Sequence, residues 1–454
     1  MKRLALLSCT AALAACNLAP NYERPAPPVP PAWPSGAAYP AADAAVKTGL
    51  PWNALIGDER LRTVIERALA NNRDLRVTLA NVLAARAQYR IQRAAQLPTV
   101  TADTGATLSR RNGQRQDSYS ADVGFSAFEI DLFGRLRNLS EAALQSYLAT
   151  QEGARAARIA LVAETANAYA TLAADRQLLA VSRDTLASAE RTLTLTRSLN
   201  GVGLSGKLDV HQAETIVEQA RSDVAAAVTQ VAQDRNAIDL LAGAPVEDAL
   251  LPVSLQTLVG SIAQVPAGLS SEVLLQRPDV LEAEHRLQAA NADIGAARAA
   301  MFPRISLTTA IGVASSALSS LFSGGAFSWT AAPSASLPIF GGGVRGNVEY
   351  SKAQRDAALA TYEGAIQSAF REVVDALARA GTIGDQQRAQ RALVLSSEQA
   401  YALSEQRYRA GIDPFLTTLV NQRSLYAARR SAIATDLELL QNRIALYRVI
   451  GADF

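Results

Sequence analysis

The sequence predicts an α+β membrane protein in which pairs of β-strands alternate with very long helices. Three observations lead to this fold class. Two segments alternate apolar and polar residues with the period of a strand, and two long segments repeat apolar residues with the period of a helix. The whole pattern of strands and helices also occurs twice along the chain.

The N-terminus predicts a signal sequence followed by a lipid anchor. Lys2 and Arg3 precede the apolar run Leu4–Ala15, which is too short to cross a bilayer as a helix. Leu13-Ala14-Ala15-Cys16 is similar to the lipobox of bacterial lipoproteins, so we expect removal of residues 1–15 and lipidation of Cys16. Asn17 stands where an aspartate commonly retains lipoproteins at the inner membrane, which favours the outer membrane. The alternative is an ordinary signal in which Cys16 occurs by chance.

Composition excludes several classes of function. The 44 basic and 42 acidic residues nearly balance, so no nucleic-acid partner is expected. Cys9 lies inside the signal and leaves the mature chain no pair for a disulfide. His211 and His285 are the only histidines and are expected on helices without partners. We therefore expect no metal site and no cofactor other than the covalent lipid on Cys16.

Proline divides the chain into an extended part and helical parts. Half of the 18 prolines lie between Pro20 and Pro51, which predicts an extended strap. Near-continuous helix is predicted from Arg135 to about Asn200 and from Val344 to about Ala410, where proline is absent and alanine is abundant. Each helix would be about 100 Å long, a length that a rod or tunnel needs and a single globular domain does not.

Two regions have the period of strands. Thr99–Leu108 and Tyr119–Ser126 alternate, and the polar residues Arg110–Ser118 are expected to join them as a hairpin. Ile305–Val344 contains no charged residue, and its alternation and its Ser, Thr and Gly content fit two tilted strands better than a membrane helix. Phe327 and Trp329 are either interfacial or core aromatics.

An internal repeat relates the two halves. Gly203 and Gly411 lie 208 residues apart (411 − 203), and the pairs Gly243/Gly451 and Leu208/Leu416 have the same separation. Four strands cannot close a barrel, so the chain must form oligomers to span a membrane. The expected segments are a signal at 1–15, a strap at 16–60, a first helix at 61–97, hairpins at 98–132 and 302–340, helical pairs at 135–243 and 342–451, a connection at 244–276 and a helix at 277–301.

Several short motifs occur in order along the mature sequence. They are Pro20-Asn21-Tyr22, Asp131-Leu132-Phe133-Gly134, Arg277-Pro278-Asp279-Val280-Leu281-Glu282-Ala283-Glu284 continuing through Ala289-Ala290-Asn291-Ala292-Asp293-Ile294-Gly295 to Phe302-Pro303, and Tyr408-Arg409-Ala410-Gly411. With them the chain resembles the TolC-like outer-membrane factors, in the lipoprotein branch of drug-efflux channels (NodT-type efflux lipoproteins).

This resemblance implies a homotrimer in which each chain contributes four strands to a 12-stranded barrel in the outer membrane. The long helices would continue the barrel as a periplasmic tunnel, with the turns at Gly203 and Gly411 at its far tip. Such channels bind a periplasmic adaptor and an inner-membrane pump and release drugs or other small molecules. The resemblance therefore implies a passive duct and no enzyme activity.

The resemblance also places a constriction after the second turn, at positions matching Leu416, Val420 and Arg423. Val420 stands where an aspartate is often found, which leaves Asp209 and Asp413 as the nearest carboxylates. Our hypothesis is that a ring of Leu416 side chains closes the channel instead of a charged ring. The alternative for each residue is helix packing near a turn.

Other interpretations compete with the channel. Gly201–Lys207 matches most of a phosphate-binding loop, but Leu208 replaces the Ser or Thr that would bind magnesium. Arg277 precedes Pro278 and Asp279, which is a helix-start signal rather than a catalytic one. A periplasmic adaptor lipoprotein would share the anchor and long helices but would not need two membrane-type hairpins. A duct for peptide or protein secretion is the nearer alternative.

Overall fold

The computed structural model describes residues 17–40, 51–263 and 271–450. The expected signal sequence and Cys16 lie outside the described residues. Two compact units divide the chain. The described part of the first comprises residues 17–27, 80–153 and 279–365, and that of the second comprises 28–40, 51–79, 154–263, 271–278 and 366–450.

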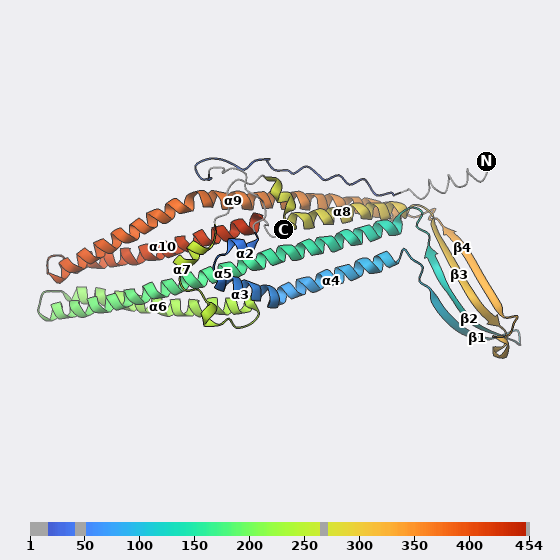
Figure 1. Cartoon of the computed structure of the whole chain (residues 1–454), viewed down its shortest axis with the longest axis horizontal. Helices are drawn as coiled ribbons and strands as arrows, with labels where there is room; N and C mark the ends of the chain where they lie inside the picture. Colours follow the sequence, from blue (N-terminus) through green and yellow to red (C-terminus); the bar gives the residue numbers. More distant parts are fainter. Residues whose placement is uncertain (1–16, 41–50, 264–270, 451–454) are drawn as a thin grey trace. The chain divides into compact units, whose positions relative to one another are not determined.

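Four antiparallel strands form one sheet in the order β1-β2-β3-β4 (Figure 1). They are β1 (Thr101–Arg111), β2 (Gln114–Glu129), β3 (Arg304–Ser315) and β4 (Phe327–Ser336). β1 pairs with β2 and β3 with β4, while β2 pairs with β3 and so joins the two halves of the chain. Because β1 and β4 are the outer strands, one edge of each is left without a strand partner in the described part of the chain.

The first hairpin is tighter than the sequence analysis predicted. In place of a nine-residue link over Arg110–Ser118, only Asn112 and Gly113 separate β1 from β2. Both residues have positive φ, 50° and 81°. Asn-Gly favours this two-residue turn because both residues tolerate positive φ, and the turn's twist matches that of the strands. The polar residues around it therefore extend the strands.

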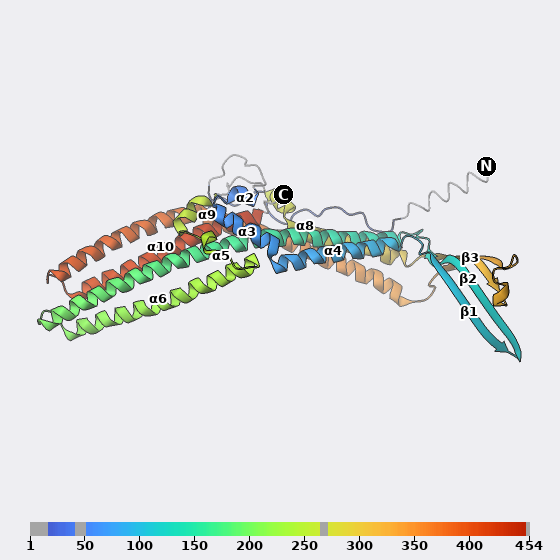
Figure 2. The same cartoon turned by 60° about the horizontal axis from the view of Figure 1, so that its bottom comes forward.

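The two longest helices confirm the helical prediction. α5 (Arg135–Gly201) has 67 residues and α9 (Gly342–Arg409) has 68. Each is followed by a 36-residue helix, α6 (Lys207–Ala242) after α5 and α10 (Phe415–Ile450) after α9. Figures 1 and 2 both show α6 beside α5 and α10 beside α9, so the chain contains two long helical hairpins.

The repeat extends to the helices that precede the strands. α4 (Arg73–Ala94) and α8 (Pro278–Ala299) both have 22 residues, and each leads into the first strand of a hairpin. Where one helix was expected over 61–97, α3 (Glu59–Asn71) and α4 are separate helices. Asn72 ends the first, since its N–H donates to the Ala68 carbonyl, and caps the second by accepting from the Leu75 N–H at 2.9 Å.

Short elements complete the fold. They are α2 (Trp52–Leu55), α7 (Leu255–Ser261) and the 3₁₀ turns η1 (Asp248–Leu250), η2 (Ser271–Gln276) and η3 (Leu318–Ser320). Residues 17–40 contain no helix or strand. Among the described helices, none contains a stretch both long and apolar enough to cross a bilayer.

Candidate functional site

The turns that join the helical hairpins have the same backbone structure. Gly203 and Gly411 follow their helices with φ of 79° and 70°, a conformation that glycine adopts without strain. The Gly203 N–H donates to Asn200 and the Leu204 N–H to Leu199, at 3.0 and 2.8 Å. The second turn has the equivalent bonds, from Gly411 to Tyr408 and from Ile412 to Arg407, both 2.9 Å. Both turns are thus Schellman motifs, which satisfy the last helical carbonyls.

Below the turns, all four hairpin helices share one apolar cluster. Its buried members come from α5, α6, α9 and α10, and they are Ala189, Leu193, Ala213, Val217, Tyr408, Phe415 and Leu419. The Tyr408 and Phe415 rings lie 5.4 Å apart between centroids, and the Tyr408 hydroxyl donates to the Thr196 hydroxyl at 3.1 Å. This packing fixes the direction of the first turns of α10.

The three candidate constriction residues form a stripe on α10, at spacings of four and three residues. Leu416 and Val420 are 56% and 53% exposed, while Phe415 and Leu419 on the adjacent face of the helix are buried. Arg423 lies one turn further along and borders a groove that also contains Asp223 and Tyr426. The structure therefore presents two exposed apolar side chains on one face of the helix, followed by a cation.

The two nearby carboxylates do not belong to this stripe. Asp209 accepts hydrogen bonds from the Ser205 hydroxyl and the Gly206 N–H, at 2.8 and 3.1 Å, and so caps α6. Asp413 is held by the Arg407 guanidinium through two bonds of 2.6 and 2.8 Å, which lowers the pKa of that carboxyl below its usual range. Each carboxylate is bound within its own turn.

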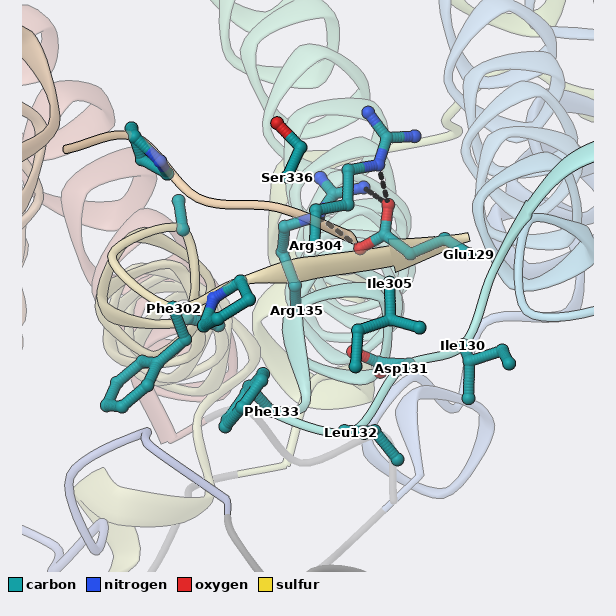
Figure 3. Close-up of a pocket in the computed structure, with 14 residues that line it drawn as sticks. Glu129, Ile130, Asp131, Leu132, Phe133, Arg135, Phe302, Arg304, Ile305 and Ser336 are labelled. Carbon is teal, nitrogen blue, oxygen red and sulfur yellow. Dashed lines mark hydrogen bonds and ion pairs between the residues drawn. The ribbon is translucent and has the colours of Figure 1, made fainter. Parts of the chain in front are cut away.

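A second site lies where the strands meet the helices, in the first unit (Figure 3). Glu129 ends β2 and is buried between two cations. Arg135, at the start of α5, donates two bonds of 2.8 and 2.7 Å to its carboxylate, and Arg304, at the start of β3, lies 2.7 Å away. A buried carboxylate needs such partners, and here they tie β2 to both neighbouring elements.

Two motifs from different halves of the chain meet beside this ion cluster. Phe133 and Phe302 stack with ring centroids 4.7 Å apart and an interplanar angle of 19° (Figure 3). Asp131 accepts from the Arg137 N–H at 2.9 Å, and Gly134 turns the chain into α5 with a φ of 77°. The contact therefore joins the Asp-Leu-Phe-Gly motif after β2 to the Phe-Pro motif before β3.

The long motif around residues 277–299 binds the N-terminal strap. Glu284, 4% exposed, accepts two bonds from Arg24 at 2.8 and 2.6 Å and one from the Tyr22 hydroxyl at 3.2 Å. Burial and the Glu284 carboxylate raise the pKa of Tyr22. The Asn291 amide donates a hydrogen bond of 2.7 Å to the Pro20 carbonyl. The Arg298 guanidinium donates one of 3.0 Å to the Leu18 carbonyl. The motif therefore holds the segment that directly follows Cys16.

Sequence reasoning missed this strap contact. The spacing of Glu284, Asn291, Gly295 and Arg298 places them on one helical face, which was a usable signal. A Cβ atom at Gly295 would lie 2.7 Å from the Ala19 backbone nitrogen, so this glycine permits the close approach of the strap.

The expectation that both histidines lack partners is wrong. The His211 ring lies 3.0 Å from Glu214, and the His285 ring 2.7 Å from the Gln145 side chain. Arg277 is buried and donates to the Val449 carbonyl at 2.7 Å and to Glu372 at 3.0 Å, so it ties α8's start to α10 and α9. No group of three or more His, Cys, Asp or Glu residues suitable for a metal occurs in the described ranges.

The two helices of the first hairpin each contribute one member of a pair of acidic residues. Asp234 on α6 is buried, and one of its oxygens accepts from the Gln230 amide at 3.0 Å. Burial, together with the neighbouring Asp234 carboxyl, raises the pKa of Asp175 on α5 to about 7. Two neighbouring carboxyls that are at least partly buried cannot both ionise easily, so we expect the pair to share a proton near neutral pH.

Comparison with known proteins gives a consistent result. A family model described as "Outer membrane efflux protein" matches residues 64–244 and 269–452. An antibiotic efflux pump outer membrane protein, ArpC, and a toluene efflux pump outer membrane protein, TtgC, both of Pseudomonas putida, are each 44% identical, over 99% of this chain and 95% of theirs. The open state of the MtrE outer membrane channel of Neisseria gonorrhoeae is 34% identical, with a TM-score of 0.86 over 96% of this chain and 98% of that one.

Proposed function

Since the chain belongs to the outer membrane efflux protein family, we propose that it forms, as a homotrimer, the exit duct of a tripartite efflux system. It is the outer-membrane component of an efflux system, a channel protein and not an enzyme. In this proposal a periplasmic adaptor and an inner-membrane pump deliver the cargo. Relatives named for toluene and antibiotic efflux point to small organic molecules as that cargo.

The observation that carries the oligomer is the sheet with two open edges. β1 and β4 are the outer strands, and large apolar side chains on them are exposed, among them Leu108, Phe327 and Trp329. Unpaired strand edges cost several kcal/mol per backbone group in lipid. Pairing β4 of one copy with β1 of the next removes every open edge when the ring of copies closes.

The closure of the duct rests on the stripe of α10. Three copies would bring three Leu416 side chains together near the periplasmic end, with Val420 as a second apolar layer. A narrow apolar constriction excludes ions because water leaves it. Asp209 and Asp413 are bound within their own turns, so we expect the apolar layers to close the duct. We also expect Arg423 to pair with a carboxylate of a neighbouring helix. We expect the turns at Gly203 and Gly411 to form the tip that meets the adaptor.

The anchor is the remaining part of the proposal. We expect a lipid on Cys16, inserted into the inner leaflet of the outer membrane. The strap contacts at Leu18, Pro20, Tyr22 and Arg24 support this because they hold the chain beside α8 from the second residue after the cysteine.

Native mass spectrometry of protein extracted from outer membranes tests the proposal. We expect a trimer of chains that begin at Cys16, each with the added mass of lipid. A Cys16→Ala variant is the control for the lipid and should lack the added mass. A stable monomer would leave the strand edges open and would contradict the channel.

A further inference from the structure

The two helix-to-strand corners of the chain have the same geometry. Leu97 follows the end of α4 by three residues and precedes Pro98, just as Phe302 follows the end of α8 and precedes Pro303. The Leu97 N–H donates to the Ala94 carbonyl at 2.9 Å, and the Phe302 N–H donates to that of Ala299 at 3.1 Å. Leu97 and Phe302 are therefore equivalent positions of the repeat.

The strand-to-helix corners are also equivalent in position. Phe133 lies two residues before α5, Phe340 lies two residues before α9, and a glycine follows each. Their surroundings differ. Phe133 stacks on Phe302, whereas Phe340 is fully exposed and Leu97 is 69% exposed. The Phe133 and Phe302 corners therefore contact each other within the chain. The equivalent corners, at Phe340 and Leu97, do not contact each other.

We propose that Phe340 packs on Leu97 of a second copy of this chain, reproducing between copies the Phe133–Phe302 contact. The proposal rests on the trimer of the proposed function, because only pairing of β4 with a second copy's β1 brings these corners together. The pairing of β2 with β3 within the chain is the model for this arrangement. In it, the second strand of one half lies beside the first strand of the other half.

The repeat also predicts the register of this pairing. Glu129 pairs with Ser306 in the chain, and the equivalent positions are Ser336 on β4 and Thr101 on β1. Ser336 should therefore pair with Thr101 of the second copy. Beyond this pair, the Ile130 N–H donates to the Ile305 carbonyl at 2.9 Å, three residues before Phe133. Leu337 is the position equivalent to Ile130, and it lies three residues before Phe340.

The junction between copies differs from the internal one in charge. Ser336, Gly342 and Thr99 occupy the positions of Glu129, Arg135 and Arg304, so the ion cluster has no counterpart there. Gly341, unlike Gly134, does not have a positive φ. The contact between copies is therefore apolar, and we expect it to be insensitive to salt.

Cross-linking in outer membranes tests the contact. The double variant Leu97→Cys/Phe340→Cys, treated with a short bismaleimide, should give covalent dimers and trimers. Either single variant should stay at the mass of one chain, which also controls for any thiol of Cys16. The double variant Phe133→Cys/Phe302→Cys should form a cross-link within the chain and give no covalent dimers or trimers.

A second pair separates this proposal from the proposed function. If Thr101→Cys/Ser336→Cys gives covalent dimers and trimers and Leu97→Cys/Phe340→Cys does not, the proposed contact between Phe340 and Leu97 is wrong. The proposed trimer is then still supported. If neither pair links and the native mass is that of one chain, both proposals fail. As an independent measurement, Phe340→Ser should lower the temperature at which trimers dissociate in SDS, and Phe340→Leu should keep it near that of the wild type. Equal behaviour of the two variants would overturn the contact.

Discussion

The two helical hairpins, α5–α6 and α9–α10, have the same backbone structure but different side chains at equivalent positions. Their turns have the same glycine, the same Schellman bonds and return helices of equal length. At equivalent positions, however, Lys207 is exposed in the first hairpin and Phe415 is buried in the second. Asp175 and Asp234 in the first correspond to Ile383 and Asn442 in the second, both of which are buried.

The comparison separates features that both hairpins need from features in which they differ. The turn geometry is required in both copies because each helix must reverse its direction without leaving carbonyls unsatisfied. The side chains along the hairpins diverged, so that the second hairpin begins its return helix from a packed aromatic. That packing sets the direction of Leu416 and Val420, which follow it on α10.

The largest expected effect comes from removing the packed aromatic of the second hairpin. Phe415→Ala should lower the free energy of unfolding by about 3–5 kcal/mol, because it leaves a cavity among four helices. Lys207→Ala, the equivalent change in the first hairpin, should stay within about 0.5 kcal/mol. Thermal melting of the purified trimers measures both. Equal losses would show that the two hairpins do not differ in this way.

Replacing the turn glycine by alanine should destabilise the two hairpins by similar amounts. Gly203→Ala and Gly411→Ala each place a Cβ atom at positive φ, which costs about 1–2 kcal/mol, and no atom within 4 Å of that Cβ adds a clash. Melting curves of the two variants should therefore shift by similar amounts. A much larger shift in one of them would mean that the turns have different roles in stability.

The acidic pair should make the stability of the first hairpin depend on pH between about 4 and 7. An unfolded aspartate releases its proton near pH 4, whereas the pair holds one up to about pH 7. The folded chain binds more protons in this interval, so stability falls as pH rises from about 4 to 7 and is constant above. Water partly screens the pair, so we expect a loss of about 1 kcal/mol.

Asp234→Asn gives the first hairpin the residue type of Asn442 and should remove this pH dependence. Melting temperatures at several pH values between 4 and 8 measure the effect. Asp184→Asn, at an exposed position of α5, is the matched control and should retain the wild-type profile. An unchanged slope in Asp234→Asn would exclude the pair as its origin.

The smallest effects are expected from the carboxylates of the turns. Asp413→Asn and Asp209→Asn remove charges that are bound inside their own turns, so the ion selectivity and conductance of the reconstituted channel should be unchanged. Reversal potentials in a salt gradient measure selectivity. A large change in either variant would place a charged ring at the constriction and would argue against an apolar closure.

Features set by local sequence could be predicted. Helical period, absence of proline and the repeat were enough to predict α5 and α9, and alternation was enough to predict strands. The Asn112–Gly113 turn was also a local signal, but the surrounding polar residues suggested a longer link. Polar residues are compatible with an exposed strand, so polarity alone does not mark a loop.

Features set by distant residues could not be predicted. Glu129 meets Arg304 only because β2 pairs with β3, and nothing near Glu129 in the sequence indicates that partner. The strap contacts of Glu284 join residues 260 positions apart. The candidate constriction was different again, because its residues came from a resemblance, and the single chain leaves Leu416 exposed rather than in contact with its equivalents.

The most direct test of closure by Leu416 is the conductance of the channel in planar bilayers. We expect a small conductance for the wild type and a clear increase for Leu416→Ser, because a polar ring keeps water and ions in the constriction. Leu208→Ser, at the equivalent exposed position of the first hairpin, is the matched control and should behave like the wild type. An unchanged conductance in Leu416→Ser, with trimers still present, would contradict closure by the Leu416 ring.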